Sequence, residues 1–323
     1  MPRKRDWTGG ILEAMPILLL GVVFLVFGAL SPSFLEIKNI SNILVQSSAT
    51  MILATGMAFV LLSGNIDLSV GSIMYLGAAL AGKLIYTSSG SAGMIFLGLL
   101  IFILCGVVFG CVNGILVTRL RILAFIVTLG TLYVGRGLGH LVTQTRAMNL
   151  PESFLEIGAS SVLFLPVPII VAAAVVIVAQ GLLDRTVFGR QIYALGHNPK
   201  SAHVAGIPIQ KRLFLVFVIS GVFAALAGIV ALSQVGAVDP TFGFEREFTA
   251  ITAAVLGGVS LFGGKGRIFP GVVMGAILLQ TIQSGLVVLN VDPYYYPILN
   301  GAILFLAVLV DALKNMQKGA RHG

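Results

Sequence analysis

The chain has 323 residues, of which 57% are hydrophobic and only 10% are charged. Soluble domains carry about 25% charged residues, so this composition excludes a soluble domain and indicates one polytopic membrane domain. The net charge of +8 does not indicate nucleic-acid binding, because the basic residues lie in short loops between apolar segments. We therefore expect membrane lipid around the chain and no nucleic-acid partner.

The apolar runs, taken in chain order, predict about ten membrane-spanning helices of an all-α bundle. The basic start of the chain and the first run resemble a signal peptide. We interpret this run as a retained helix, because its loss would leave an odd number of spans. The third and eighth runs are short for the roughly 20 residues that a spanning helix needs. The predicted helices cover residues 14–30, 43–62, 70–86, 94–117, 122–142, 162–183, 213–235, 248–262, 268–289 and 297–312.

Residues 64–71 interrupt the apolar pattern after the second predicted helix, and they read Gly-Asn-Ile-Asp-Leu-Ser-Val-Gly. Asp67 fits the N-cap of the third helix, where its carboxylate would accept hydrogen bonds from free amide groups. A role of Asp67 in gating or in partner contact stays open.

Glycines recur at helical spacing in two of the later helices. Gly106, Gly110 and Gly114 repeat every four residues in the fourth helix, and Gly271 and Gly275 do so in the ninth. Small residues at this spacing let two helix backbones approach closely, so we expect a compact bundle and not a wide water-filled pore.

Arg136 and His140 lie four residues apart, on one face of the fifth helix. Arg136 is a candidate for a solute route, although snorkelling outward or bonding to exposed carbonyls would also account for it. No Asp or Glu falls deep in a predicted helix, which argues against a proton-coupled transporter. Cys105 and Cys111 fit packing thiols, and the chain offers no metal-ligand set. Polar residues that would line a path, or equally hold helices together, are Asn113, Thr128, Gln234, Gln280, Gln283 and Asn300.

Residues 184–212 form a basic, mostly polar island with several Lys and Arg residues against a single acid, Asp184. Basic loops stay in the cytoplasm. Placing both chain ends and this island there puts most of the 20 Lys and Arg residues on that side. Within the island, Asn198 and Pro199 are a helix-start signal, and Pro208 stops the short turn over residues 200–205.

A second interruption reads Gly-Gly-Lys-Gly-Arg, and its Gly264 is separated from Gly271 as Gly64 is from Gly71. Matched glycine breaks in two halves hint at an internal duplication with the transport route between them. Lys265 does not complete a phosphate-binding loop, because no Ser or Thr follows it. The chain has no recognisable nucleotide site, so any ATP chemistry would come from another subunit.

Three separated motifs, in order, make this chain similar to the permeases of bacterial ABC importers for ribose, galactose and related sugars. The first interruption resembles the family's Gly-Ile-Asp-Leu-Ser-Val-Gly, and the basic island resembles Gly-Arg-x-Ile-Tyr-Ala-x-Gly-Gly-Asn followed by Ala-Gly-Ile. The resemblance covers about residues 31–311. It departs at His197, which replaces a Gly, and at Glu247, Phe248 and Thr249, which replace Glu-Leu-Asp. The three motifs and the segments that match beside them lie at residues 64–71, 188–198, 205–207, 255–267 and 306–311.

The resemblance implies a type II ABC importer fold in the bacterial inner membrane, with residues 1–323 as one permease domain. It implies a second permease subunit (homodimer or heterodimer), an ABC ATPase subunit, and a periplasmic or lipid-anchored sugar-binding protein. ATP and Mg would bind the ATPase, and this chain would hold no cofactor. Residues 198–207 would form the coupling helix, with Gly196 and Gly206 allowing the backbone to turn at each end. Residues implied in ATPase coupling are Gly189, Arg190, Gly196, Asn198, Pro199, Ala202, Ala205 and Gly206. Residues implied in gating are Gly64, Asp67, Ser69, Gly71, Gly264 and Lys265.

By this resemblance we expect the chain to carry a ribose-like monosaccharide through the membrane by alternating access, without being an enzyme itself. Two alternatives stay open. One is a permease of the same superfamily for another solute, such as branched-chain amino acids or nucleosides. The other is a secondary transporter or a membrane enzyme, and the lack of a metal or nucleophile set argues against the enzyme.

Overall fold

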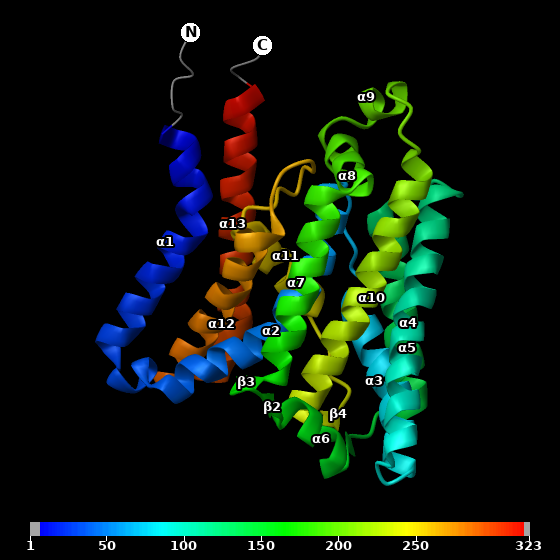
Figure 1. Ribbon diagram of the computed structural model, residues 1–323, viewed down its shortest axis with the longest axis vertical. Coiled ribbons are helices and arrows are strands. Elements are labelled where there is room, and N and C mark those ends of the chain that lie inside the picture. Colours follow the sequence, from blue (N-terminus) through cyan, green and yellow to red (C-terminus); the bar gives the residue numbers. More distant parts are fainter. Residues whose placement is uncertain (1–6, 320–323) are drawn as a thin grey trace.

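The chain forms a helical bundle in which the strands are only two residues long (Figure 1). The computed structural model describes residues 7–319. The start of α1, the end of α13 and the short helix α9 lie at the same end of the bundle. The elements are α1 (Trp7–Leu30), η1 (Pro32–Leu35), α2 (Ile37–Leu62), α3 (Val70–Thr87), α4 (Ala92–Thr118), α5 (Ala124–Thr143), β1 (Met148–Asn149), α6 (Glu152–Ala159), β2 (Ser161–Val162), β3 (Leu165–Pro166), α7 (Val167–Arg185), α8 (Val187–His197), α9 (Pro199–Val204), α10 (Ile209–Val235), β4 (Ala237–Val238), α11 (Arg246–Leu256), η2 (Ile268–Val272), α12 (Val273–Val288), η3 (Pro293–Tyr295) and α13 (Tyr296–Gly319).

Within the described residues, eight helical segments are long and apolar enough to cross a membrane. This confirms the predicted polytopic all-α bundle, and each predicted apolar run contains a helix. The apolar segment Pro16–Leu30 within α1 is shorter than these eight. The eight segments are Ile37–Leu62, Val70–Thr87, Ala92–Thr118, Ala124–Thr143, Val167–Arg185, Ile209–Val235, Ile268–Val288 and Pro293–Leu313.

The prediction of the eighth helix over residues 248–262 is wrong for its last residues, 257–262. α11 ends at Leu256, and Gly257 is its C-cap. The chain then turns at Gly258, whose φ of 87° lies in the region that favours glycine. At 11 residues α11 rises about 16 Å, roughly half the hydrocarbon thickness. It is therefore a half-helix within the bundle and not a span.

The repeated glycines lie at helix–helix contacts, as predicted. A Cβ on Gly106 or Gly110 would meet backbone carbonyls of α10, at Gly221 and Phe217. A Cβ on Gly275 would likewise meet the Ala253 carbonyl of α11. Backbones this close leave no room for side chains between them, so the pairs α4–α10 and α11–α12 are tightly fixed.

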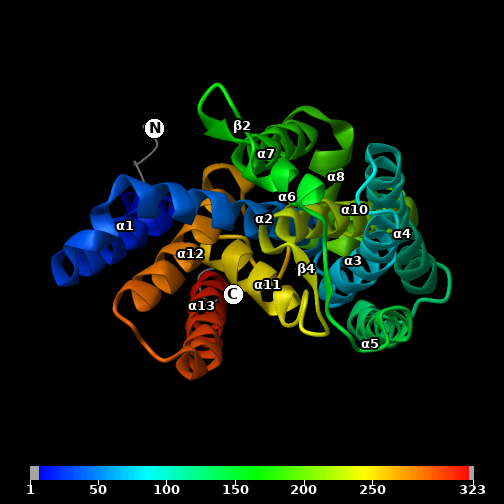
Figure 2. The same cartoon turned by 90° about the horizontal axis from the view of Figure 1, so that it is seen from below.

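Figure 2 shows the bundle from its other end, with α3, α4 and α5 on one side and α1, α12 and α13 on the other. α2, α10 and α11 lie between these groups. The second half of α2 is buried almost without interruption, from Ile52 to Leu62. A helix that is apolar all round and buried all round belongs to the centre of a bundle.

At the end of the bundle opposite α9, two distant segments are tied together by a short antiparallel ladder. β1 follows α5 and pairs with β4, which follows α10, with Met148 opposite Val238. The Leu150 amide also donates to the Gly236 carbonyl at 2.8 Å. This ladder fixes the start of the segment 236–245, which leads into α11.

Candidate functional site

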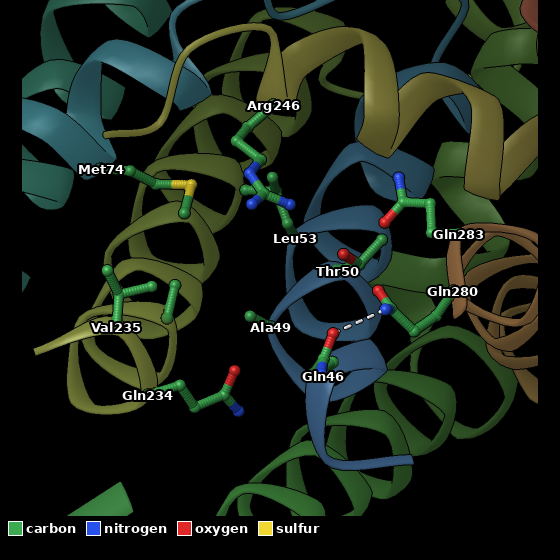
Figure 3. A pocket seen from close by; sticks show the side chains of 11 residues that line it. Gln46, Ala49, Thr50, Leu53, Met74, Gln234, Val235, Arg246, Gln280 and Gln283 are labelled. Carbon is green, nitrogen blue, oxygen red and sulfur yellow. Dashed lines mark hydrogen bonds between the residues drawn. The ribbon is translucent and has the colours of Figure 1, made fainter. Parts of the chain in front are cut away.

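A cavity of about 270 Å³ lies between α2, α10, α11 and α12 (Figure 3). It has room for roughly nine waters at about 30 Å³ each, which is the scale of one small solute. A second cavity, of about 320 Å³, shares Gln46, Gln280 and Gln283 with the first, so the two lie side by side. We call this combined space the amide cavity. Its polar lining residues are Asn39, Asn42, Gln46, Thr50, Gln234, Arg246, Gln280, Gln283, Ser284, Tyr296 and Asn300.

Four of the six predicted path residues line the amide cavity. Gln234 lies on α10, Gln280 and Gln283 on α12, and Asn300 on α13. Gln280 donates to the Gln46 side-chain oxygen at 2.8 Å, a bond drawn in Figure 3. The Gln234 amide group donates to the Val45 carbonyl at 2.9 Å. These bonds hold the amides in place and leave other donors and acceptors for a solute.

The other two predicted path residues lie elsewhere, in a buried network. Asn113 donates to Ser69 Oγ at 2.8 Å and accepts from Thr131 at 2.8 Å. Thr128 bonds back to carbonyls of its own helix. Because a fully buried amide with both ends bonded has little left for a solute, Asn113 joins helices in this structure.

Asp67 belongs to the same network and is fully buried. Its Oδ1 accepts from the Ser69 amide at 2.9 Å and from Ser69 Oγ at 2.6 Å, and its Oδ2 accepts from Ser220 at 2.8 Å. The expectation that Asp67 is the N-cap of the third helix is wrong by two residues, since Ser69 holds that position. The carboxylate instead ties the first interruption to α10.

Arg136 lies against the segment 236–245 and does not line the cavity. Its Nη1 donates to the Phe242 carbonyl at 2.9 Å, and its guanidinium lies over the rings of Tyr75 and Phe244. His140, one turn away, lies within 3.1 Å of the Tyr75 hydroxyl, so the predicted shared face is confirmed. Of the alternatives for Arg136, bonding to carbonyls is the one that this geometry supports.

Glu247 is a second buried carboxyl, although no Asp or Glu falls deep in a predicted helix. It starts α11, is 6% exposed and packs against Gly71 at the start of α3. Its Oε2 is buried with no hydrogen-bond partner in the described part of the chain. The sequence does not reveal this, because Glu247 stands at the edge of an apolar run and its segment folds back into the bundle.

The segment expected to couple to an ATPase stands at one end of the bundle, where α9 protrudes (Figure 1). Asn198 caps α9 by accepting from the Ser201 amide at 3.0 Å, and Pro199 is its first residue, as the sequence indicates. Val204 is 88% exposed, whereas Ala202 is only 3% exposed. The outward contact surface of α9 is therefore formed by its exposed end and not by Ala202.

The glycines around α9 have different roles. Gly206 has a φ of 76° and turns the chain after α9, as expected. Gly196 does not turn the chain, because it lies inside α8, where a Cβ would meet the Leu62 carbonyl and the Gly264 amide. Gly189 is similarly packed against the Leu183 backbone, while the Arg190 side chain is exposed.

The two glycine interruptions meet beside α8. The Gly264 amide donates to the Leu62 carbonyl at 2.9 Å, so the end of α2 and the loop after α11 are directly bonded. The Tyr193 hydroxyl of α8 donates to the Gly266 carbonyl at 2.8 Å. Burial first, and Asp184 next, raise the pKa of Tyr193, which keeps its phenol protonated as a donor. We call the contact of Gly196, Leu62 and Gly264 the backbone junction. Gly64, with φ of 77°, and Lys265 flank it in the two interruptions.

Gln46 and Arg246 are among the lining residues of the amide cavity that the sequence does not single out. A signal for the first exists: Asn42, Gln46 and Thr50 recur every four residues, which places them on one face of α2. Arg246 carries no such signal, because only the folding of 236–245 into the bundle brings it to the cavity. No group of three metal-ligating side chains occurs within the described residues.

Comparisons of the sequence with known proteins show the family and the relatives of this chain. The family model described as "Branched-chain amino acid transport system / permease component" matches residues 39–308. The chain is 39% identical to the D-allose transport system permease protein AlsC of Escherichia coli, over 91% of this chain and 90% of that protein. It is 36% identical to the ribose import permease protein RbsC of Bacillus subtilis, over 97% of both chains. It is 34% identical to the galactose/methyl galactoside import permease protein MglC of Salmonella typhimurium, over 96% and 95%. No solved structure matches.

Proposed function

We propose, because this chain belongs to the family of permease components of branched-chain amino acid transport systems, that it is the membrane subunit of an ATP-driven monosaccharide importer. The observation that carries the proposal is that similarity to allose, ribose and galactose import permeases extends over nine tenths or more of the chain. The solute is a ribose-like or allose-like sugar, and the protein moves it across the bacterial inner membrane.

The chemistry of the amide cavity supports a sugar over an amino acid. Side-chain amides present both donors and acceptors, which suits a neutral molecule covered with hydroxyl groups. A free amino acid would bring an ammonium group, and no Asp or Glu is among the residues that line either cavity. A nucleoside would demand an apolar slot for its base, whereas the lining of both cavities is rich in amides.

The chain works with three partners in this proposal. A second permease subunit covers the amide cavity, since polar groups inside a membrane face a partner or a water-filled path and not lipid. An ABC ATPase subunit binds ATP and Mg and docks at α9. A periplasmic or lipid-anchored binding protein delivers the sugar at the opposite end. Both termini and residues 184–212 are then cytoplasmic, in keeping with the basic charge of that segment.

Transport in this proposal rests on rigid-body motion of helices. ATP-driven closure of the ATPase pushes α9, and α8 passes the displacement to the backbone junction at Leu62 and Gly264. From there it reaches α2 and α12, the helices that carry Gln46, Gln280 and Gln283. Because these contacts are between backbones, a displacement of one segment moves its neighbour by nearly the same amount. As a result, the cavity opens alternately to each side of the membrane.

Reconstitution in lipid vesicles tests the function. The permease is combined with an ABC ATPase subunit and a sugar-binding protein, and uptake of labelled ribose, allose, galactose, leucine and a nucleoside is compared. We expect ATP-dependent uptake of a monosaccharide, and no ATP hydrolysis by the permease alone. Uptake of leucine or a nucleoside without sugar uptake would move the solute to another class. Uptake driven by a proton gradient without ATP would overturn the importer.

A further inference from the structure

Arg246 is a cationic side chain without a partner inside the bundle. It begins α11, and in Figure 3 its guanidinium reaches into the cavity between Leu53 and Met74. Within the described residues, no hydrogen bond or ion pair engages it. More than a third of its surface is exposed, and it is one of the residues that line the first cavity.

The contrast with Arg136 shows that the fold can satisfy an arginine at this depth. Arg136 donates to the Phe242 carbonyl, and its guanidinium lies over two aromatic rings. Arg246, only a few residues further along the segment that Arg136 holds, has none of these contacts. An arginine that serves only to fix the fold would be bonded, because an unpaired charge inside a membrane protein is unfavourable.

The groups around Arg246 complement what it offers. Its planar guanidinium presents several N–H donors in a fixed fork, a geometry that suits two oxygen atoms side by side. The nearby amides of Gln46, Gln234, Gln280 and Gln283 supply acceptors as well as further donors. Adjacent hydroxyl groups on a ring are paired oxygens of this kind, and each also needs an acceptor for its own proton.

We propose that Arg246 is the solute-binding residue of the translocation path. Its guanidinium donates hydrogen bonds to adjacent hydroxyl oxygens of the sugar, and the glutamine side-chain oxygens accept hydrogen bonds from those hydroxyl groups. Its fixed positive charge also keeps cations out of the path, so that the open cavity does not leak protons or sodium. The identity of the solute as a sugar rests on the proposed function. The position of the Arg246 charge in the path is independent of which solute is carried.

Transport by the complete importer tests the binding role. Replacing Arg246 by Met removes the donors and keeps the bulk, and we expect sugar uptake at saturating binding protein to fall about tenfold to a hundredfold. ATP hydrolysis stimulated by the loaded binding protein and membrane abundance should stay within about twofold of the wild type. Sugar uptake by the Arg246→Lys variant should lie between that of the wild type and that of Arg246→Met. Arg146→Met is the matched control, since Arg146 is exposed on an outer loop and lines neither cavity. Wild-type uptake in Arg246→Met would overturn the proposal, and so would an equal loss of abundance in the Met and Lys variants.

A measurement without sugar separates the two proposals. Ala49 lines the cavity and is changed to Cys in a chain without Cys105 and Cys111. In the purified complex, an anionic methanethiosulfonate reagent should label Ala49→Cys about tenfold faster than a cationic one of similar size. Adding Arg246→Met should abolish this preference. Equal labelling rates with Arg246 present would show that its charge is not in the path. If the preference is found but no sugar is transported, the proposed function fails and the charged path stands.

Discussion

At the scale of single residues, Gly71 shows how closely this bundle is built. A Cβ there would meet the Glu247 carboxylate and the Gly243 carbonyl, which come from the segment leading into α11. The start of α3 and this segment therefore touch without any side chain of α3 between them. Gly71 belongs to the first sequence motif, and the packing gives a physical reason for glycine at that position.

Replacing Gly71 by Ala should lower the stability of the protein by about 1–3 kcal/mol, because the added methyl group forces two backbones apart. Thermal unfolding of the purified protein in detergent would show a lower midpoint. The matched control is Gly137→Ala in α5, where nothing lies within 4 Å of the added Cβ. That change should be neutral or stabilising, as Ala is the better helix former. Equal midpoints for the two variants would contradict this account of Gly71.

The sequence identifies the polar residues of the bundle but not which way each of them faces. Gln234, Gln280 and Gln283 line the amide cavity, while Asn113, of the same chemical type, is buried in a network with Ser69. Helical periodicity fixes which residues of one helix share a face, and the neighbours of that face depend on tertiary packing. Arg246 was beyond prediction for the same reason, since its position depends on a segment that folds back into the bundle.

At the scale of elements, the short helix α9 has exposed residues at its end and a buried residue on its inner side. Val204 and Ala205 are exposed, and Ala202 is packed against the protein itself. The sequence shows where α9 starts, through Asn198 and Pro199, but a helix this short has too few residues to show which side is buried. The structure thus shifts the test of coupling from Ala202 to the exposed end of the helix.

Replacing Val204 and Ala205 by Asp should reduce sugar uptake about tenfold or more, because two charges would enter the contact with the ATPase. Membrane abundance should not change, since both side chains are exposed. Val204→Thr, which keeps the shape without adding charge, should behave as the wild type. Ala202→Asp should instead lower abundance, as it buries an unpaired charge in the protein. Normal uptake in the double Asp variant would place the coupling contact outside α9, with the loop at Lys265 as the next candidate.

The two glycine interruptions show which features can be predicted from the sequence and which cannot. Both glycine breaks are evident in the sequence, and so are the helices on either side. Their contact through Gly264 and Leu62 is not evident, because the two residues are 202 positions apart and no local sequence pattern indicates such a pair. The expectation that Gly196 turns the chain is wrong for the same reason. Glycine is required there because distant backbone atoms of Leu62 and Gly264 leave no room for a Cβ.

At the scale of the whole molecule, the two ends of the bundle differ in character. One end holds α9, the start of α1 and the end of α13, and the other holds the β1–β4 ladder and the β2–β3 hairpin (Figure 1). Together with the positions of the basic residues, this supports a cytoplasmic location for the α9 end.

Single cysteines at Ser201 and Thr241, each in a chain without Cys105 and Cys111, test this orientation. Both positions are exposed, at opposite ends of the bundle. A membrane-impermeant thiol reagent added to cells with a permeable outer barrier should label Thr241→Cys and spare Ser201→Cys. After the cells are opened, both should react, which confirms that Ser201→Cys is reactive. The reverse pattern in intact cells would invert the topology.

The half-helix α11 has a consequence for how the protein is made. At about 16 Å it is too short to partition into the bilayer as an independent span when it leaves the ribosome. Its tightest neighbours, Gly271 and Gly275, are synthesised after it. We therefore expect the end of α11, at Ala253 and Gly257, to reach its final packing only after η2 and α12 have been synthesised. Insertion of this protein into the membrane would then include a late step, in which a half-helix is completed by a helix that follows it in the chain.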